Sequence, residues 1–270
     1  MPRRIPGSLF VRNLVERRSL LFQLVRRDFE QRFVGSVMGW VWAVIHPLVL
    51  LVSWTFVFSV CLRAKLSPGE VTQDYPMYLF AGMLPWLLFS ETVQRSASSL
   101  LEQASLITKT VFPAEIVPVS IFLSSLLSHL LALALVVAAA GIRLRQISLW
   151  LILLPVFMIL LGLLSIGIGW ITAALQVYLR DTAQVLSVIL TFWFWLTPIF
   201  ITESQIPPPL RFLIAGNPLA YIVRAYRLLL LSHRLPGWHD VAVAAAFAVI
   251  TFCAGGLFFR HMKRGFADVL

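Results

Sequence analysis

The chain has 270 residues, of which 59% are hydrophobic and only 13% are charged, and its formal net charge at pH 7 is +10. Its mean hydropathy is +0.87. Soluble globular domains hold about 45–50% apolar and about 25% charged residues. The composition therefore excludes an ordinary soluble protein and predicts an integral membrane protein.

Long stretches of the sequence carry no Asp, Glu, Lys or Arg, and each is a candidate membrane span. Five such runs cover residues 33–62, 116–142, 146–179, 182–202 and 241–259, and a sixth, 75–94, contains Glu91 as its single charge. A helix needs about 20 residues to cross a hydrocarbon core of ~30 Å. We therefore expect an all-α integral membrane fold with six transmembrane helices, in a transmembrane domain over residues 33–260.

The distribution of Lys and Arg predicts which side of the membrane each end occupies. Eight of these residues precede the first apolar run and three follow the last. Basic residues accumulate on the cytoplasmic side, so we place both termini of this multi-pass chain in the cytoplasm, including the tail 261–270. Six spans then leave 14 of the 22 basic residues inside. The eight outside are Arg63, Lys65, Arg143, Arg145, Arg211, Arg224, Arg227 and Arg234.

Residues 1–32 predict a cytoplasmic segment with an amphipathic helix that lies in the headgroup layer. At 100° per residue, seven apolar residues share one side of this helix. They are Val11, Leu14, Leu21, Phe22, Val25, Phe29 and Phe33. Arg18 and Arg32 interrupt the stripe. Such a basic helix anchors the first span. In a second interpretation, Arg17, Arg26 and Arg27 contact the headgroup of an anionic lipid-linked substrate.

The connection between the fifth and sixth runs, about residues 203–236, is partly apolar and rich in proline. Its stretch 212–223 is too short to cross a bilayer, and the prolines break helices. They are Pro207, Pro208, Pro209 and Pro218. We expect a re-entrant helical hairpin, which is tolerated at membrane depth only where protein or a water-filled cavity covers it. An interfacial loop without a function is the alternative.

No motif for energy coupling or catalysis is present in the sequence. A phosphate-binding loop needs GxxxxGK followed by Ser or Thr, and none of the three lysines, Lys65, Lys109 and Lys263, follows a glycine. Zinc-protease and nucleophile-elbow motifs are missing as well. We expect no catalytic site, no metal and no cofactor in this chain. It is then either a passive channel or scaffold, or a transporter subunit powered by a separate ATPase.

Four blocks occur in order along the chain. They are Arg32-Phe-Val-Gly-Ser-Val-Met-Gly-Trp-Val-Trp-Ala-Val-Ile-His-Pro47; Ala81-Gly-Met-Leu-Pro-Trp86 followed by Ser105-Leu-Ile-Thr-Lys-Thr-Val-Phe-Pro-Ala-Glu-Ile-Val-Pro118; Tyr178-Leu-Arg-Asp181 to Thr197-Pro198; and Asn217-Pro-Leu-Ala-Tyr-Ile-Val-Arg-Ala-Tyr-Arg227. Together they resemble the membrane (permease) subunits of ATP-binding-cassette polysaccharide exporters, which handle O-antigen, teichoic acid or capsule. The sequence departs from that family at Thr108, where a second basic residue is common.

The resemblance implies export of a lipid-linked polysaccharide across the cytoplasmic (inner) membrane. It also implies a homodimer that binds two ATP-binding subunits, which hold ATP and Mg²⁺; no nucleic-acid partner is expected. The alternatives are a drug or small-lipid exporter of the same superfamily, and a non-transporting scaffold for glycan assembly.

By the same resemblance, residues of about 100–112 are a coupling helix that docks on the ATPase, whereas a tight cytoplasmic turn is the structural alternative. The residues expected at this contact are Leu106, Ile107, Lys109, Phe112, Pro113, Glu115, Arg180 and Asp181. Asp181 or Thr182 is also well placed to cap the helix that follows.

Aromatic residues are concentrated in the fourth and fifth apolar runs. They include Trp170, Tyr178, Phe192, Trp193, Phe194 and Trp195. Membrane Trp usually marks the interface, but four consecutive aromatic residues point to all sides of a helix. We hypothesise that some of these rings line a substrate path and stack against sugar faces. For any single ring, a position facing lipid is the alternative.

Overall fold

A computed structural model describes residues 18–32, 36–109, 112–145, 148–232 and 234–269, and every regular element in these ranges is helical. The long helices are α3 (Trp42–Thr55), continued by the π-helix η2 (Phe56–Cys61), α4 (Tyr75–Glu102), α6 (Ile116–Leu144), α7 (Leu154–Tyr178), α8 (Thr182–Leu196) and α11 (Trp238–Met262). The shorter helices are α2 (Arg18–Gln31), α5 (Ala104–Lys109), α9 (Arg211–Ala215), α10 (Pro218–Leu231) and α12 (Phe266–Val269), and single turns are η1 (Gly39–Val41), η3 (Leu149–Leu153), η4 (Glu203–Gln205), η5 (Pro208–Leu210) and η6 (Lys263–Gly265). The all-α prediction is confirmed.

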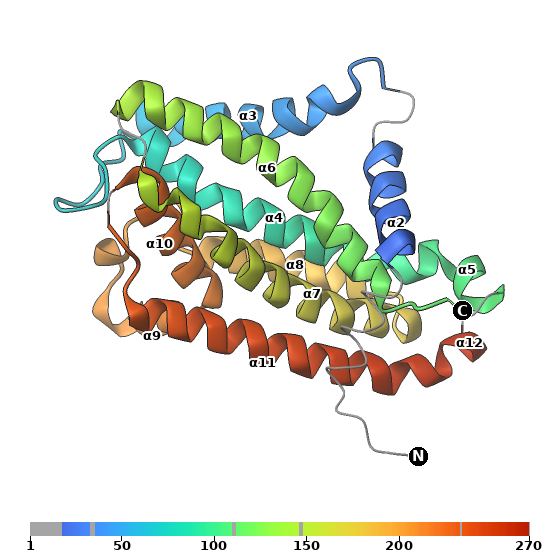
Figure 1. Cartoon of the computed structure of the whole chain (residues 1–270). Coiled ribbons are helices and arrows are strands. Elements are labelled where there is room, and N and C mark those ends of the chain that lie inside the picture. The colour runs from blue at the N-terminus through green and yellow to red at the C-terminus, as the bar shows by residue number, and fades with distance from the viewer. Residues whose placement is uncertain (1–17, 33–35, 110–111, 146–147, 233, 270) are drawn as a thin grey trace.

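The long helices lie side by side along a common axis (Figure 1). α4 and α7 contact each other at the centre, α6 and α10 pack on α4, and α11 packs along α7. α3 and α8 contact the bundle over fewer residues and lie at its margin. We call the end of the bundle that holds α5 and α12 the α5 end (right in Figure 1), and the opposite end, with α9 and α10, the α10 end.

The close approach of α7 and α11 depends on two glycines. A Cβ atom on Gly255 would lie 2.1 Å from the carbonyl oxygen of Gly167, and a Cβ atom on Gly167 would lie 2.6 Å from the carbonyl oxygen of Thr251. Such contact between helix backbones is a common way to pack helices in membranes, where apolar side chains gain nothing by leaving lipid. The face of α7 that carries Gly167 is therefore packed against α11 of the same chain.

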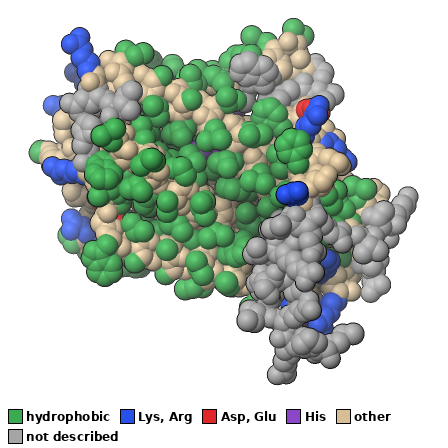
Figure 2. All heavy atoms as spheres, in the orientation of Figure 1, with side chains coloured by type: hydrophobic (Ala, Val, Ile, Leu, Met, Phe, Trp, Pro, Cys, Tyr) green, Lys and Arg blue, Asp and Glu red, His purple; other side chains and the backbone are tan. Residues whose placement is uncertain are grey.

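The surface of the bundle is suited to a bilayer. Figure 2 shows hydrophobic side chains across its middle and Lys and Arg gathered toward its ends. Four described segments are long and apolar enough to cross a membrane, Val44–Cys61, Ile116–Arg143, Leu149–Tyr178 and Trp238–Gly265. These correspond to four of the six predicted spans. The other two differ: α4 has 28 residues but carries Glu91 and Arg95, and α8 has only 15.

The predicted hairpin region forms two helices, α9 and α10. Pro218 is the first residue of α10, a position that needs no backbone N–H. The Asn217 side chain caps this helix, because its Oδ1 accepts from the N–H of Leu219 (3.1 Å). α10 is buried along most of its length against α4, α7 and α11. Proline therefore interrupts the helical segment between α9 and α10, as predicted. Pro218 is also the first residue of the buried helix α10.

Candidate functional site

The consecutive aromatic residues of α8 divide between exposed and packed positions. Phe192 and Trp195 are 71% and 57% exposed. Trp193 is half-buried, and its Nε1 donates to Oδ1 of Asn217 (2.9 Å), so it joins α8 to the start of α10. Phe194 packs between Trp54 of α3 and Trp86 of α4, with ring centroids 6.0 and 5.2 Å away. Phe192 is therefore available to a ligand or a partner. Trp195 is partly available, because its ring also stacks on Phe200 with centroids 5.3 Å apart, and the two inner rings hold α8 in place.

The exposed face of α8 carries polar groups beside these rings. Its exposed polar residues are Gln184, Ser187 and Thr191, and its exposed apolar residues include Val185, Val188 and Ile189. Only Leu186 and Leu190 of this helix are buried. Spacings of three, four and seven residues put Gln184, Ser187, Thr191 and Trp195 along one side of the helix. The Thr191 hydroxyl donates to the carbonyl oxygen of Ser187 within the helix (2.8 Å), so Gln184 and Ser187 are the groups that would be unfavourable on a helix facing only lipid.

A polar row on α4 is also half-exposed. It consists of Ser90, Glu91, Gln94, Arg95 and Ser98, which recur at spacings of one, three, four and eight residues. Gln94 Nε2 donates to the carbonyl oxygen of Ala183 (3.4 Å), which places this row beside the first turn of α8. α4 and α8 thus share a polar margin toward the α5 end.

The other two predicted path residues lie elsewhere. Trp170 is 1% exposed, and its ring packs on Phe252 of α11 at 4.8 Å, while Nε1 donates to the carbonyl oxygen of Glu115 (3.0 Å). The hydroxyl of Tyr178 donates to the carbonyl oxygen of Met262 (2.8 Å) at the α5 end. The structure therefore does not bring Trp170 and Tyr178 together with the exposed rings of α8.

At the α5 end, the predicted helix of about 100–112 is divided. α4 continues to Glu102, α5 follows as a separate helix, and residues 110–111 lie outside the described ranges. Leu106 and Ile107 are half-buried, as is Phe112, and Pro113 is buried; the side chain of Lys109 is outside the description. Glu115 is paired with Lys263 (2.5 Å), which ties the start of α6 to the C-terminal segment.

The turn between α7 and α8 is organised by a residue that the sequence did not indicate. Gln176 Oε1 accepts from the N–H of Ala183, and its Nε2 donates to the carbonyl oxygen of Arg180, both at 2.7 Å. The predicted cap is wrong, because Asp181 makes no capping hydrogen bond and the Thr182 hydroxyl donates to the carbonyl oxygen of Leu179. Gln176 satisfies the free N–H in their place, so Arg180 and Asp181 stay exposed.

α2 crosses the bundle and packs on α6 (Figure 1). Arg17 lies outside the described residues; Arg26 and Arg27 are exposed, and Arg26 Nε contacts Glu30 at 2.8 Å. Leu24, which was not assigned to the apolar stripe, is the buried residue of this helix, whereas Phe22 of the stripe is 69% exposed. The stripe was thus only partly correct.

Arg32, which interrupts the stripe, has partners on other helices. Its Nη1 lies 2.6 Å from Oε1 of Glu91, and its Nη2 donates to Oγ of Ser125 (2.9 Å). Arg95 Nη2 contacts Asp28 Oδ1 at 2.5 Å. Burial lowers the pKa of Arg32, while the neighbouring carboxylates oppose that shift. This network fastens α2 to α4 and α6, and Glu91 is its centre.

Arg227 of α10 is a second functional candidate that sequence alone did not single out. It is 4% exposed. Its guanidinium donates to the carbonyl oxygens of Pro198 and Ile199 and to the Tyr78 hydroxyl, each at 2.8 Å, and lies 3.5 Å from the centroid of the Tyr78 ring. Gly82 leaves the space, because a Cβ there would lie 2.6 Å from Nη2. Arg227 thereby satisfies the carbonyls where the chain leaves α8.

Comparison with known proteins gives consistent matches along the chain. Residues 19–231 match the ABC-2 type transporter family. The chain is 30% identical to the O-antigen export system permease protein RfbA of Myxococcus xanthus, over 96% of this chain and 98% of that protein. It is 27% identical to a protein of the same name from Klebsiella pneumoniae (93% and 95%) and 23% identical to the polysialic acid transport protein KpsM of Escherichia coli (88% and 91%).

Proposed function

Because the chain belongs to the ABC-2 type transporter family, we propose that it is the transmembrane subunit of an ATP-driven exporter of lipid-linked polysaccharide. Its relatives along nearly the whole length are an O-antigen export permease and a polysialic acid transport protein. The chain would hold no catalytic site of its own, and ATP and Mg²⁺ would be bound by a partner ATPase. The exported material would be O-antigen or a related surface glycan such as capsule or teichoic acid.

The proposed placement in the inner membrane has six helices crossing the bilayer, with both termini in the cytoplasm at the α5 end. The apolar middle of the bundle and the charged ends support it. α4 would also cross the bilayer. Its charged residues Glu91 and Arg95 would then lie near the inner headgroup layer, as α2 does. α8 is about 22 Å long at 1.5 Å per residue, so the segment that follows it would complete the crossing. α9 and α10 would form the re-entrant hairpin.

The α5 end is the proposed docking surface for the ATPase. α5 offers half-buried Leu106 and Ile107, and the adjacent turn offers exposed Arg180 and Asp181. A short helix with an apolar knob and a charged rim is a common form of protein contact. Two permease chains with two ATPase chains would complete the transporter, because a single bundle with a packed core leaves no path as wide as a polymer.

The glycan part of the proposal rests on the exposed face of α8, which carries Gln184, Ser187 and Thr191 and, toward its end, the rings of Phe192 and Trp195. Sugars present apolar faces and hydroxyl edges, so they can stack on Phe192 and Trp195 and exchange hydrogen bonds with Gln184, Ser187 and Thr191. The path would lie between α8 of two copies. The exposed arginines of α2, Arg26 and Arg27, would attract the phosphate of the lipid carrier.

Co-purification with a soluble ATPase tests this proposal directly. The full chain, expressed with a candidate ABC ATPase from the same organism, should form a stable complex whose ATPase rate differs from that of the free ATPase. Arg180→Glu should weaken assembly without changing the melting temperature of the permease, because Arg180 is exposed. Arg211→Glu, an exposed charge reversal at the opposite end, is the control. A scaffold for glycan assembly would show no ATPase partner at all.

A further inference from the structure

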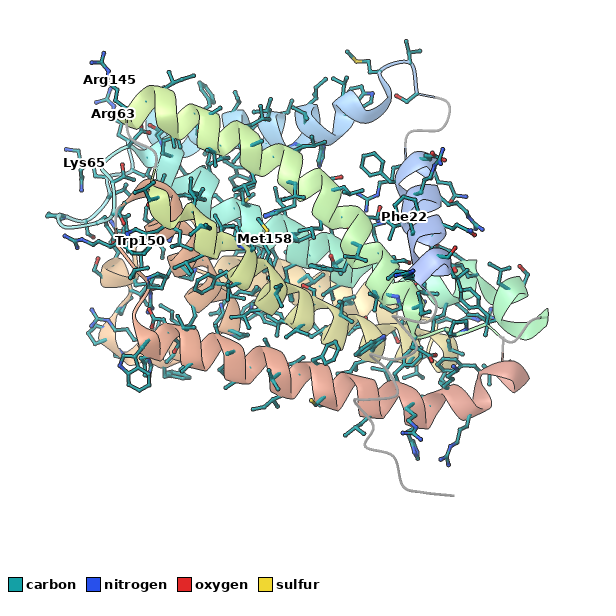
Figure 3. The ribbon with its side chains drawn as sticks, in the orientation of Figure 1. Phe22, Arg63, Lys65, Arg145, Trp150 and Met158 are labelled. Carbon is teal, nitrogen blue, oxygen red and sulfur yellow. The ribbon has the colours of Figure 1, made fainter. Side chains whose placement is uncertain are left out.

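In the described part of the chain, five exposed cations at the α10 end make no ion pair with a carboxylate: Arg63, Lys65, Arg145, Arg211 and Arg234. Figure 3 shows Arg63, Lys65 and Arg145 projecting from this end of the bundle. All three are exposed, and none makes an ion pair with a carboxylate in the described part of the chain. By contrast, Arg143 is paired with Asp74 (2.8 Å), and Arg224 with Glu203 and Asp240. Three of the five unpaired cations at this end, Arg63, Lys65 and Arg145, therefore lie in the turns after η2 and after α6.

Two of these residues have an uncommon backbone conformation. Arg63 and Arg145 have φ of +50° and +51°, and they are the non-glycine residues with positive φ in the described chain. Glycine is usual in this region, because the Cβ atom of any other L residue lies close to the following carbonyl oxygen. Both turns thus hold an arginine where glycine would relax the backbone.

Arg145 stands at the end of an apolar groove along α6. The groove has a volume of about 770 Å³. It is lined by Leu130, Leu133, Ala134, Val137, Ala138, Gly141, Ile142 and Arg145. From residue 130 to residue 142 the helix rises about 18 Å, slightly more than half of a hydrocarbon core of ~30 Å. Its length is therefore close to that of one leaflet.

A polar hollow lies at the same end of α6. It has a volume of about 480 Å³, and Ser59, Lys65, Gln73 and Arg143 are among its lining residues. Arg143 precedes Arg145 by two residues, and its ion pair with Asp74 fixes the end of α6 to the segment before α4. The hollow thus holds two cations, Lys65 and Arg143, and one carboxylate, Asp74, which is paired with Arg143, so Lys65 is its unpaired charge.

We propose that the α6 groove and the cations Arg63, Lys65 and Arg145 form a binding site for an anionic glycerophospholipid of the outer leaflet. An acyl chain lies against α6 and the headgroup phosphate lies among the three cations. Charge complementarity selects an anionic lipid, because the three cations lack carboxylate partners. The site requires the proposed placement of the α10 end at the outer headgroup layer, but not the identity of the exported glycan.

The same observations disfavour the other two occupants of the groove. A polyprenyl chain is much longer than one leaflet and would extend past the groove. A second copy of this chain, packed α6 against α6 about a two-fold axis along the bundle, would bring the same cations of both copies together at one depth, and like charges repel. The site also accounts for basic residues on the side of the membrane where they are usually scarce.

Photolabelling tests the proposal. The full chain with its ATPase is reconstituted into phosphatidylcholine vesicles that contain a trace of either phosphatidylglycerol or phosphatidylcholine with the same diazirine-bearing acyl chain. Labelling of residues 130–145 by the phosphatidylglycerol probe should exceed that by the phosphatidylcholine probe at least about fivefold, the effect expected for one surface cation. The R63Q/K65Q/R145Q variant should reduce it to the level of phosphatidylcholine.

Arg211→Gln is the matched control, since Arg211 is an exposed arginine outside the cluster at the same end. Arg145→Glu alone gives a second variant if the triple variant does not fold. Equal labelling by both probes, or full labelling of the triple variant, would overturn the site. Stronger competition by polyprenyl phosphate than by phosphatidylglycerol, or a disulfide between copies carrying Ala138→Cys, would overturn the phospholipid as its occupant. Failed ATPase assembly would instead count against the proposed function.

Discussion

Arg227 places a guanidinium between α10, α4 and the end of α8 with three partners at 2.8 Å, and these are neutral oxygens rather than carboxylates. Three carbonyl or hydroxyl groups would lose their donor if this side chain were apolar. Each buried group left unsatisfied costs about 1–3 kcal/mol. Arg227 is therefore a structural anchor for the segment that directly follows α8, whose carbonyl oxygens it binds.

Arg227→Met is expected to lower the free energy of unfolding by roughly 2–4 kcal/mol, because it removes these donors while keeping an apolar side chain of similar length. Thermal unfolding of the detergent-purified protein would measure the change. Arg227→Lys should recover part of the loss, since one ammonium can reach some of the same oxygens. Arg211→Met, at an exposed arginine, is the control, and equal melting temperatures for R227M and R211M would contradict the anchor.

Glu70 predicts a pH-dependent contribution at the α10 end. Burial raises the pKa of Glu70, Arg227 opposes the shift, and Glu203 adds to it. The folded protein then holds the proton more tightly than the unfolded chain does. Glu70 thus favours the fold below the ordinary Glu pKa of about 4.3, and this effect is lost as the pH rises through the folded-state pKa.

Glu70→Gln should therefore raise the melting temperature more at pH 8 than at pH 4, because the raised pKa of Glu70 disfavours the fold only where the carboxyl ionises. Melting curves of both proteins at the two pH values measure this difference. Glu102→Gln, at an exposed carboxylate of the other end, provides the control. A gain that is equal at both pH values would show that ionisation of Glu70 is not its cause.

Helix α8 both packs against the bundle and exposes aromatic rings, and its sequence does not show which rings do which. Phe194 and Trp193 face α3, α4 and α10, whereas Phe192 and Trp195 face outward. The sequence predicted that four consecutive rings point to all sides of the helix. Which ring is exposed depends on how α8 rolls against α4, and that follows from contacts between segments far apart in the chain.

Replacing Phe192 and Trp195 by Ala should reduce glycan export about two- to tenfold per ring, corresponding to the 0.5–1.5 kcal/mol of one aromatic contact. The melting temperature should fall less than it does for a buried ring, because both rings are mostly exposed and only Trp195 stacks on a neighbour, Phe200. Trp170→Ala is the contrasting variant: its ring is buried, and its loss should cost about 3–5 kcal/mol of stability. Export is measured as glycan reaching the cell surface, and unchanged export in F192A/W195A would exclude a path along this face.

The helices were the most predictable part of the fold, because a helix that crosses the hydrocarbon core needs a long run without charged residues. The start of α10 was less predictable: α9 ends at Ala215 and Pro218 begins α10, whereas sequence alone shows only the interruption. The network of Arg32 was not predictable, since Glu91 and Ser125 lie 59 and 93 residues further along the chain. On the helical wheel, Arg32 looked like a defect in an apolar stripe. A charge that interrupts a stripe can thus be read as a sign of a partner on another helix.

At the scale of the whole molecule, the chain has a packed core of α4 and α7 and loosely held α3 and α8 at its margin. This division is compatible with the proposed dimer, in which the core would keep its shape while the margin of each copy would line a shared path. α5 and the turn at Arg180 lie at one end, where an ATPase could move them. The cations Arg63, Lys65 and Arg145 lie at the other end, where they would hold the bundle at a fixed depth in the outer leaflet.

Transport in proteoliposomes tests the central claim most directly. The full permease and its ATPase are reconstituted together, a fluorescent lipid-linked oligosaccharide is supplied on the ATPase side, and its movement across the bilayer is followed by loss of access to a lectin added on that side. The account predicts movement that needs ATP, Mg²⁺, the permease and a hydrolysis-competent ATPase. Movement of the glycan without the ATPase would contradict this claim. So would the absence of movement when the glycan is present and the permease stimulates an active ATPase.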